Sequence, residues 1–120
     1  MEFIGLISTG KGTWGQVAGL VKRGSWDKVI LVCPEFAKQR IKQFDFAKYS
    51  ELYFFNFDKT VKELVGEIRE KLKDKIKGIE VALNIASGSG KEHIALISAL
   101  LKIPVGVKFV VLTREGITEL

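Results

Sequence analysis

Five short apolar runs alternate with longer amphipathic stretches, and this alternation constrains the fold more than any other feature of the sequence. Each run is long enough for one strand and is apolar at nearly every position, as is typical of strands that are covered on both faces. Chains in which strands alternate with helices form mainly parallel sheets with right-handed crossovers. We expect the strands at residues 3–7, 28–33, 52–57, 79–86 and 107–112.

The predicted fold class is therefore α/β. We expect a Rossmann-like three-layer sandwich around a mainly parallel five-stranded sheet, with the strand order 3-2-1-4-5. Asp58 is the predicted N-cap of the third helix, whose apolar residues recur at helical spacing. The stretch 94–103 is apolar on nearly every side, and we expect it to be shared with a second subunit. The helices are predicted at about residues 15–23, 35–44, 60–76 and 91–102.

Length and composition limit the function classes. The chain has 120 residues, of which 47% are hydrophobic, so we expect one domain over residues 1–120. The net charge of +5 is compatible with an anionic partner, but the basic residues are dispersed among acids, so direct DNA binding is not expected. No apolar run approaches 18 residues and the first ten residues lack signal-peptide features, so we expect a cytoplasmic protein without a membrane partner. A single cysteine, Cys33, and a single histidine, His93, argue against a structural metal site, and no cofactor is expected.

The first predicted strand leads into a glycine-rich loop. Gly10, Gly12 and Gly15 satisfy the G-x-G-x-x-G pattern, in which glycines permit a tight turn and a helix start binds phosphate. Glu35 lies 20 residues past Gly15, where dinucleotide-binding proteins place an acid for the ribose. One hypothesis is therefore a minimal NAD- or NADP-binding module or regulatory subunit. The loop residues that we select as ligand-binding are Ser8, Thr9, Gly10, Lys11 and Gly12.

A second loop of small residues follows the fourth predicted strand. Lys91 lies in the first turn of the next helix, where a cation opposes the helix dipole unless an anion is bound there. The alternative is that Ser87 or Ser89 simply caps the helix and Lys91 extends into water. The residues selected here are Asn84, Ser87, Gly88, Ser89, Gly90 and Lys91.

The two loops are expected to lie next to each other, which favours a single binding site formed by both. In the order 3-2-1-4-5, strands one and four are neighbours, and their carboxyl ends flank the point where ligands bind in such sheets. A phosphate-bearing ligand is the simplest occupant of that crevice. Another hypothesis is a structural or interaction domain, in which the two loops serve only as turns between strand and helix. This hypothesis predicts no nucleotide binding.

The stretch from Leu83 to Lys91, LNIASGSGK, resembles the signature loop of CARF domains. These are CRISPR-associated Rossmann-like sensors, whose fourth strand ends in an Asn-x-(Thr/Ser)-Gly-(Gly/Thr)-(Thr/Lys)-like motif. The resemblance, to stand-alone archaeal-type members, implies a homodimer that binds a cyclic oligoadenylate across its two-fold axis. It assigns the ligand to the loops after strands one and four, with Ser8, Thr9 and Gly10 in the first. In the second it implicates Asn84, Ser87, Gly88, Ser89 and Lys91.

Catalysis is not demanded by any residue. Glu92, Glu115 and Asp58 form no visible pair for acid–base chemistry, and His93 is expected to be lightly packed. Some CARF proteins degrade their own ligand, but no side chain here singles out that activity, and we expect a binding module rather than an enzyme. Trp14, inside the first loop region, either stacks on a base or packs against the following helix.

Overall fold

Six strands form one sheet in the order β3-β2-β1-β4-β5-β6, in a computed structural model that describes residues 1–10 and 12–120. The first five strands are parallel, as predicted, and their order is confirmed. The central three of them are almost completely buried, as is typical of strands that are covered on both faces, and the outer two are mostly half-buried. The parallel strands are β1 (Glu2–Leu6), β2 (Val29–Pro34), β3 (Glu51–Phe55), β4 (Glu80–Asn84) and β5 (Gly106–Thr113).

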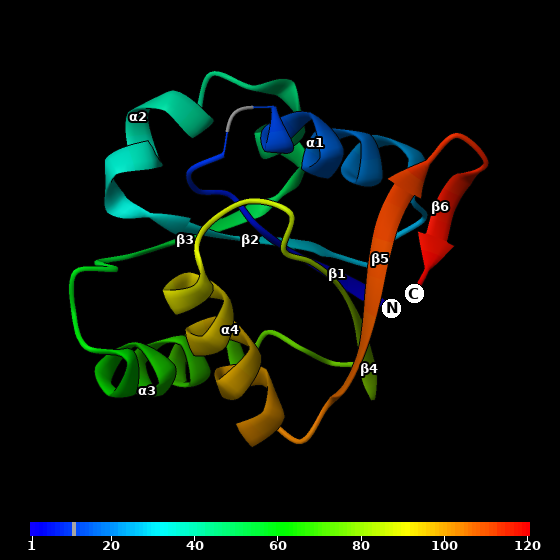
Figure 1. The fold of residues 1–120 in the computed structure, drawn as a ribbon. Helices are drawn as coiled ribbons and strands as arrows, with labels where there is room; N and C mark the ends of the chain where they lie inside the picture. Colours follow the sequence, from blue (N-terminus) through cyan, green and yellow to red (C-terminus); the bar gives the residue numbers. More distant parts are fainter. Residues whose placement is uncertain (11) are drawn as a thin grey trace.

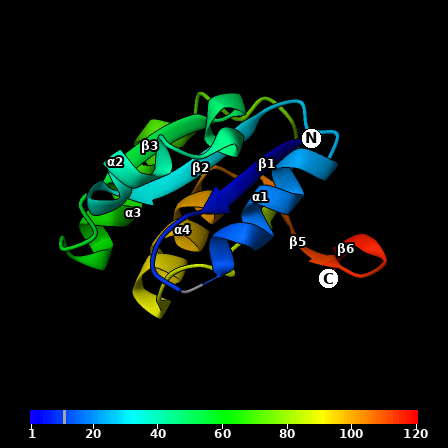
Figure 2. The same cartoon turned by 90° about the horizontal axis from the view of Figure 1, so that it is seen from above.

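The sixth strand is a correction to the prediction of five. Strand β6 (Gly116–Glu119) pairs antiparallel with β5, and Figure 2 shows this hairpin extending beyond the helices. Gly116 adopts a φ of 107°, and the Thr113 hydroxyl donates to its carbonyl at 3.0 Å, which closes the turn. The strand is short and mostly polar, so it lacks the apolar run that marked the other five.

Helices cover both faces of the sheet, which confirms the three-layer architecture (Figure 1). On one face lie α1 (Thr13–Arg23), α2 (Lys38–Ile41) and the short 3₁₀ segments η1 (Glu35–Ala37) and η2 (Asp45–Tyr49). On the other face lie α3 (Val61–Leu72) and α4 (Gly90–Lys102), which pack on each other and on the sheet.

Two helix predictions were wrong in detail. The helix expected over 35–44 is divided into η1, the four-residue α2 and a turn, because Ala37 and Ile41 are its only buried side chains. Thr60, rather than Asp58, is the N-cap of α3, where its hydroxyl accepts from the Glu63 N–H at 3.2 Å. Helix α3 also ends at Leu72, four residues before the predicted end.

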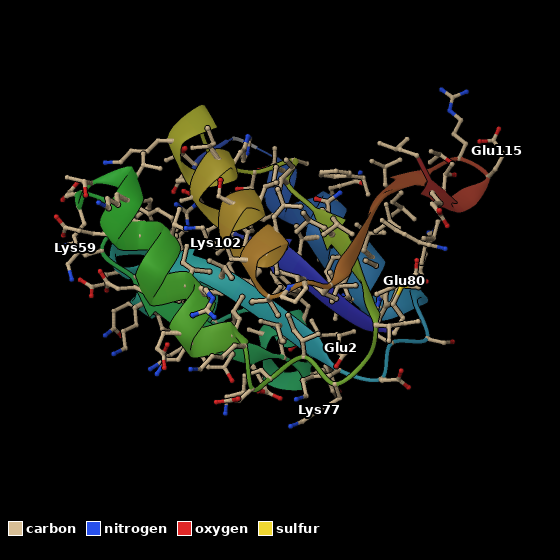
Figure 3. All side chains as sticks on the ribbon, turned by 90° about the horizontal axis from the view of Figure 1, so that it is seen from below. Glu2, Lys59, Lys77, Glu80, Lys102 and Glu115 are labelled. Atoms are coloured by element: carbon tan, nitrogen blue, oxygen red, sulfur yellow. The ribbon has the colours of Figure 1, made fainter. Side chains whose placement is uncertain are left out.

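At the amino ends of the strands, Glu2 of β1 binds the backbone of the segment that precedes β4. Residue Glu2 is 3% exposed, and its carboxylate accepts the backbone N–H groups of Lys77 and Gly78, beside the start of β4 (Figure 3).

In the part of the chain that the structure describes, no helix is long and apolar enough to cross a lipid bilayer. The opposite, carboxyl edge of the sheet carries the loops considered next.

Candidate functional site

The loops after β1 and β4 are hydrogen-bonded to each other at the carboxyl edge of the sheet. The Gly88 N–H donates to the Thr9 carbonyl at 2.7 Å, and the Ser87 hydroxyl donates to the same carbonyl at 3.1 Å. The Ser8 N–H donates in turn to the Ser87 hydroxyl at 2.7 Å. These bonds hold two segments almost 80 residues apart in the sequence as one unit.

A buried carboxylate ties both loops to the start of α4. Glu92 is 6% exposed and accepts the Ser8 hydroxyl at 2.5 Å, the Ser89 N–H at 2.8 Å and the Ser89 hydroxyl at 3.2 Å. Charged acceptors form the stronger class of hydrogen bond, and burial strengthens them further. This role of Glu92 was not predicted, although Ser89-x-x-Glu92 is a capping-box pattern, which indicates the bonds between Ser89 and Glu92.

Several predicted site residues have side chains that are hydrogen-bonded to other groups of the protein. Asn84 is 2% exposed, donates to the Val110 carbonyl at 2.9 Å and accepts the Ala86 N–H at 3.1 Å. Ser8 and Ser87 are buried as well, and the ring of His93 contacts the Ser87 carbonyl at 2.8 Å. These side chains shape the loops from within.

Other predicted residues are open to solvent. Thr9 and Gly10 in the first loop are exposed, as is Gly12. Ser89, Gly90 and Lys91 are exposed at the start of α4, and Gly88 is half-buried. Lys91 has no ion pair within residues 1–10 and 12–120. Lys11, the remaining predicted site residue, lies outside the described residues.

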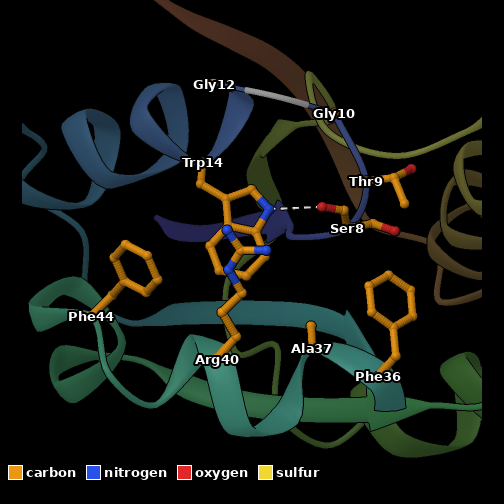
Figure 4. A pocket seen from close by; sticks show the side chains of 9 residues that line it. All are labelled: Ser8, Thr9, Gly10, Gly12, Trp14, Phe36, Ala37, Arg40 and Phe44. Carbon is orange, nitrogen blue, oxygen red and sulfur yellow. Dashed lines mark hydrogen bonds between the residues drawn. The ribbon is translucent and has the colours of Figure 1, made fainter.

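A cavity of about 610 Å³ opens on the other side of the first loop, toward the segment that follows β2 (Figure 4). The loop after β4 does not line it. Trp14 forms one wall, and its indole N–H donates to the Ser8 carbonyl at 2.7 Å. The residues lining the cavity are Ser8, Thr9, Gly10, Gly12, Trp14, Phe36, Ala37, Arg40 and Phe44.

The contribution of the segment after β2 to this cavity was not predicted. The Arg40 guanidinium lies 5.6 Å from the centre of the Trp14 ring, and the Phe44 ring lies 5.3 Å from it, edge-on. The available signal was aromatic residues in a basic segment that directly follows β2, the strand beside β1. Because parallel strands all end at one edge, this segment lies at the same edge of the sheet as the loops after β1 and β4.

The dinucleotide pattern fits the structure only in part. Gly10 and Gly12 have φ angles of 123° and 84°, which favour glycine. Gly15, the third glycine, has open space where a Cβ would lie, so it does not serve the close helix packing that this position usually serves. Glu35 is exposed at the start of η1 and does not line the cavity.

In the described part of the chain, the lone thiol and the metal-ligating side chains offer no further reactive site. Burial raises the pKa of the Cys33 thiol to about 12, which leaves it protonated and unreactive at neutral pH. No group of three or more metal-ligating side chains occurs within the described residues.

The fold resembles that of a solved structure, "Structure of Can2 from Sulfobacillus thermosulfidooxidans in complex with cyclic tetra-adenylate (cA4)". The two chains share 11% sequence identity with a TM-score of 0.62, over 99% of this chain. This chain spans about a third of the other, 36% of its length. No protein-family model matches the sequence, and no curated protein matches it either. At this identity the likeness is one of fold.

Proposed function

We propose that this chain is a sensor module that binds a phosphate-bearing nucleotide of the cyclic oligoadenylate class at the loops after β1 and β4, as a homodimer. The observation that carries the proposal is the hydrogen-bonded pair of loops at the carboxyl ends of two neighbouring parallel strands. Ligands of open α/β sheets bind at that position. The similarly folded Can2 structure contains cyclic tetra-adenylate, which supports this class of ligand.

The exposed groups have the chemistry for phosphate. The start of α4 offers backbone N–H groups, and the exposed Thr9 lies on the neighbouring loop, whereas the Ser89 hydroxyl already donates to Glu92. Lys91 supplies a positive charge at a helix end where an anion is already favoured. Ser8, Ser87 and Glu92 act indirectly, because their bonds hold the two loops in place.

A two-fold dimer suits a cyclic ligand, since two copies present the same loops from opposite sides. The outer face of α4 supports association, because Ile94 and Leu101 are 55% and 66% exposed. These residues are two helical turns apart and share one side of the helix.

The first experiment is a thermal-shift and calorimetric panel with cyclic tri-, tetra- and hexa-adenylate, linear oligoadenylate, NAD, NADP, ATP and AMP. A ligand at 100 times its dissociation constant adds about 2.7 kcal/mol to the unfolding free energy, which is readily resolved. We expect a cyclic oligoadenylate to bind, and chromatography of the mixture shows whether it stays intact. Binding of NAD or NADP alone would replace the proposal with the dinucleotide hypothesis, and no binding at all would reject both.

Lys91→Glu tests the phosphate site. We expect affinity for the cyclic ligand to fall about tenfold or more, because a positively charged hydrogen-bond donor is replaced by a carboxylate that repels the phosphate. The variant should stay folded, since an acid in the first turn of α4 favours the helix. Lys102→Glu, at the other end of α4 and also exposed, makes the same change in net charge and should bind as the wild type does. Equal affinity of Lys91→Glu and wild type would remove Lys91 from the site.

A further inference from the structure

We infer that the cavity between the first loop and the segment after β2 is a pocket for a purine base, which stacks between Phe36 and the paired Arg40 and Trp14 side chains. The inference rests on the proposed function, because it names where the base of the same nucleotide is bound. It adds a third segment, 35–44, to the two loops already considered.

The cavity has the size and lining of a small-molecule site. Its volume of about 610 Å³ lies in the range of ordinary ligand pockets, which are mostly apolar with a few polar groups. Three aromatic rings and one guanidinium line it, together with Ser8, whose carbonyl accepts from Trp14, and Thr9. No carboxylate is among the lining residues, so the Arg40 charge is not neutralised within the cavity.

Phe36 presents an aromatic face without a ring partner among the described residues. Its side chain is 70% exposed, although Ala37 beside it is buried. In Figure 4, Phe36 stands on one side of the hollow and Trp14, Arg40 and Phe44 stand on the other. A planar ring placed between the two sides would cover the exposed face of Phe36.

The opposite wall is already arranged for stacking. The bond from the Trp14 indole to the Ser8 carbonyl fixes the orientation of the ring, and Arg40 lies over that ring. A guanidinium held on an indole keeps a planar face available, and both groups stack on bases regardless of sequence. Arg40 also has no ion pair in the part of the chain that the structure describes.

The position of the pocket matches a nucleotide that spans the first loop. Thr9 and Gly10 line the cavity, and the Thr9 carbonyl accepts from the loop after β4 on its other side. A phosphate at the start of α4 and a base against Phe36 would therefore contact opposite sides of the same short loop.

The test compares two exposed aromatic residues. Phe36→Ala should weaken binding of cyclic tetra-adenylate about 5- to 100-fold, the effect that loss of one base-stacking ring produces. Tyr49→Ala removes an aromatic side chain that is 78% exposed and does not line the cavity, and it should bind as wild type. Unchanged affinity in both Phe36→Ala and Arg40→Ala, with wild-type protein binding the ligand, would overturn the base pocket and leave the proposed function standing.

A second readout separates the two proposals. In a Trp26→Phe background, Trp14 is the only tryptophan, so its fluorescence reports directly on the pocket. We expect adenosine, which carries no phosphate, to quench Trp14 at millimolar concentration, and Phe36→Ala to weaken that quenching. Quenching by adenosine without any binding of cyclic oligoadenylate would support the pocket and reject the proposed function. No quenching by either ligand would reject the pocket.

Discussion

Glu92 shows how much of the site depends on one side chain. A single buried carboxylate accepts three hydrogen bonds, one from the loop after β1 and two from Ser89, the N-cap of α4. Removing it leaves the buried Ser8 hydroxyl and the Ser89 N–H without their acceptor, and unsatisfied buried groups are costly. The serines and the glutamate together make the two loops one rigid piece.

Glu92→Ala should lower the free energy of unfolding by about 1–3 kcal/mol, because it leaves a buried donor unpaired. Urea denaturation measures this directly. The matched control is Glu63→Ala, since Glu63 occupies the same third position of α3 but is exposed. We expect the control to lose about 1 kcal/mol at most, the size of a helix-dipole interaction. Equal losses in the two variants would show that Glu92 acts only through the dipole.

At the scale of elements, the two glycines in the middle of helices α1 and α3 differ in the space around them. Gly66 lies in the exposed middle of α3, where a Cβ would meet nothing within 4 Å. Gly19 lies in the middle of α1, where a Cβ would come within 2.4 Å of the Leu112 side chain on β5. A side chain at position 19 would therefore require the end of the Leu112 side chain to move.

Alanine at these two positions should change stability in different ways. Gly66→Ala should raise the free energy of unfolding by about 0.5–1 kcal/mol, because alanine favours the helix and fits without a shift. Gly19→Ala gains the same propensity but must displace Leu112, so its stability should lie below that of Gly66→Ala. Thermal melts of both variants decide the point. A gain in Gly19→Ala as large as in Gly66→Ala would mean that Leu112 moves at no cost.

The element scale also shows where sequence patterns are informative. The apolar runs predicted the strands β1 to β5, which the structure confirms. Strands β1, β2 and β4 are almost completely buried, whereas β3 and β5 are mostly half-buried. Strand β6 was missed because it is short and half exposed, and only the Arg114-Glu115-Gly116 turn hinted at a hairpin. The segment after β2 was predicted as one helix because its basic residues favour helices, although it has too few apolar residues to bury a continuous face.

At the scale of the whole molecule, the exposed side of α4 bears on assembly. Helix α4 was predicted to be apolar on nearly every side, and most of its apolar residues are buried against α3 and the sheet. Ile94 and Leu101 remain exposed, and association with a second copy would cover them.

Leu101→Glu should therefore convert the proposed homodimer to a monomer, because a charge would be buried in the contact. Sedimentation velocity at several protein concentrations gives the masses. Ile79→Glu is the matched control, since Ile79 is 87% exposed but lies in the segment before β4 and not on α4. Wild-type protein with the mass of one chain at every concentration would remove the dimer from the proposal.

The sequence by itself determined the class of fold, the positions of the five parallel strands and the two glycine-rich loops that follow the first and the fourth, whereas the strand order was taken from the fold class. These properties follow from local apolar patterns and turn residues, which act over a few neighbouring positions. Only the tertiary structure decided which loop side chains point inward, because Ser8 and Ser87 find each other across 79 positions of sequence. The aromatic pocket has the same origin, since its walls come from the loop after β1 and the segment after β2. Whether a side chain binds a ligand or its own neighbour depends on which distant groups the fold brings within hydrogen-bonding distance.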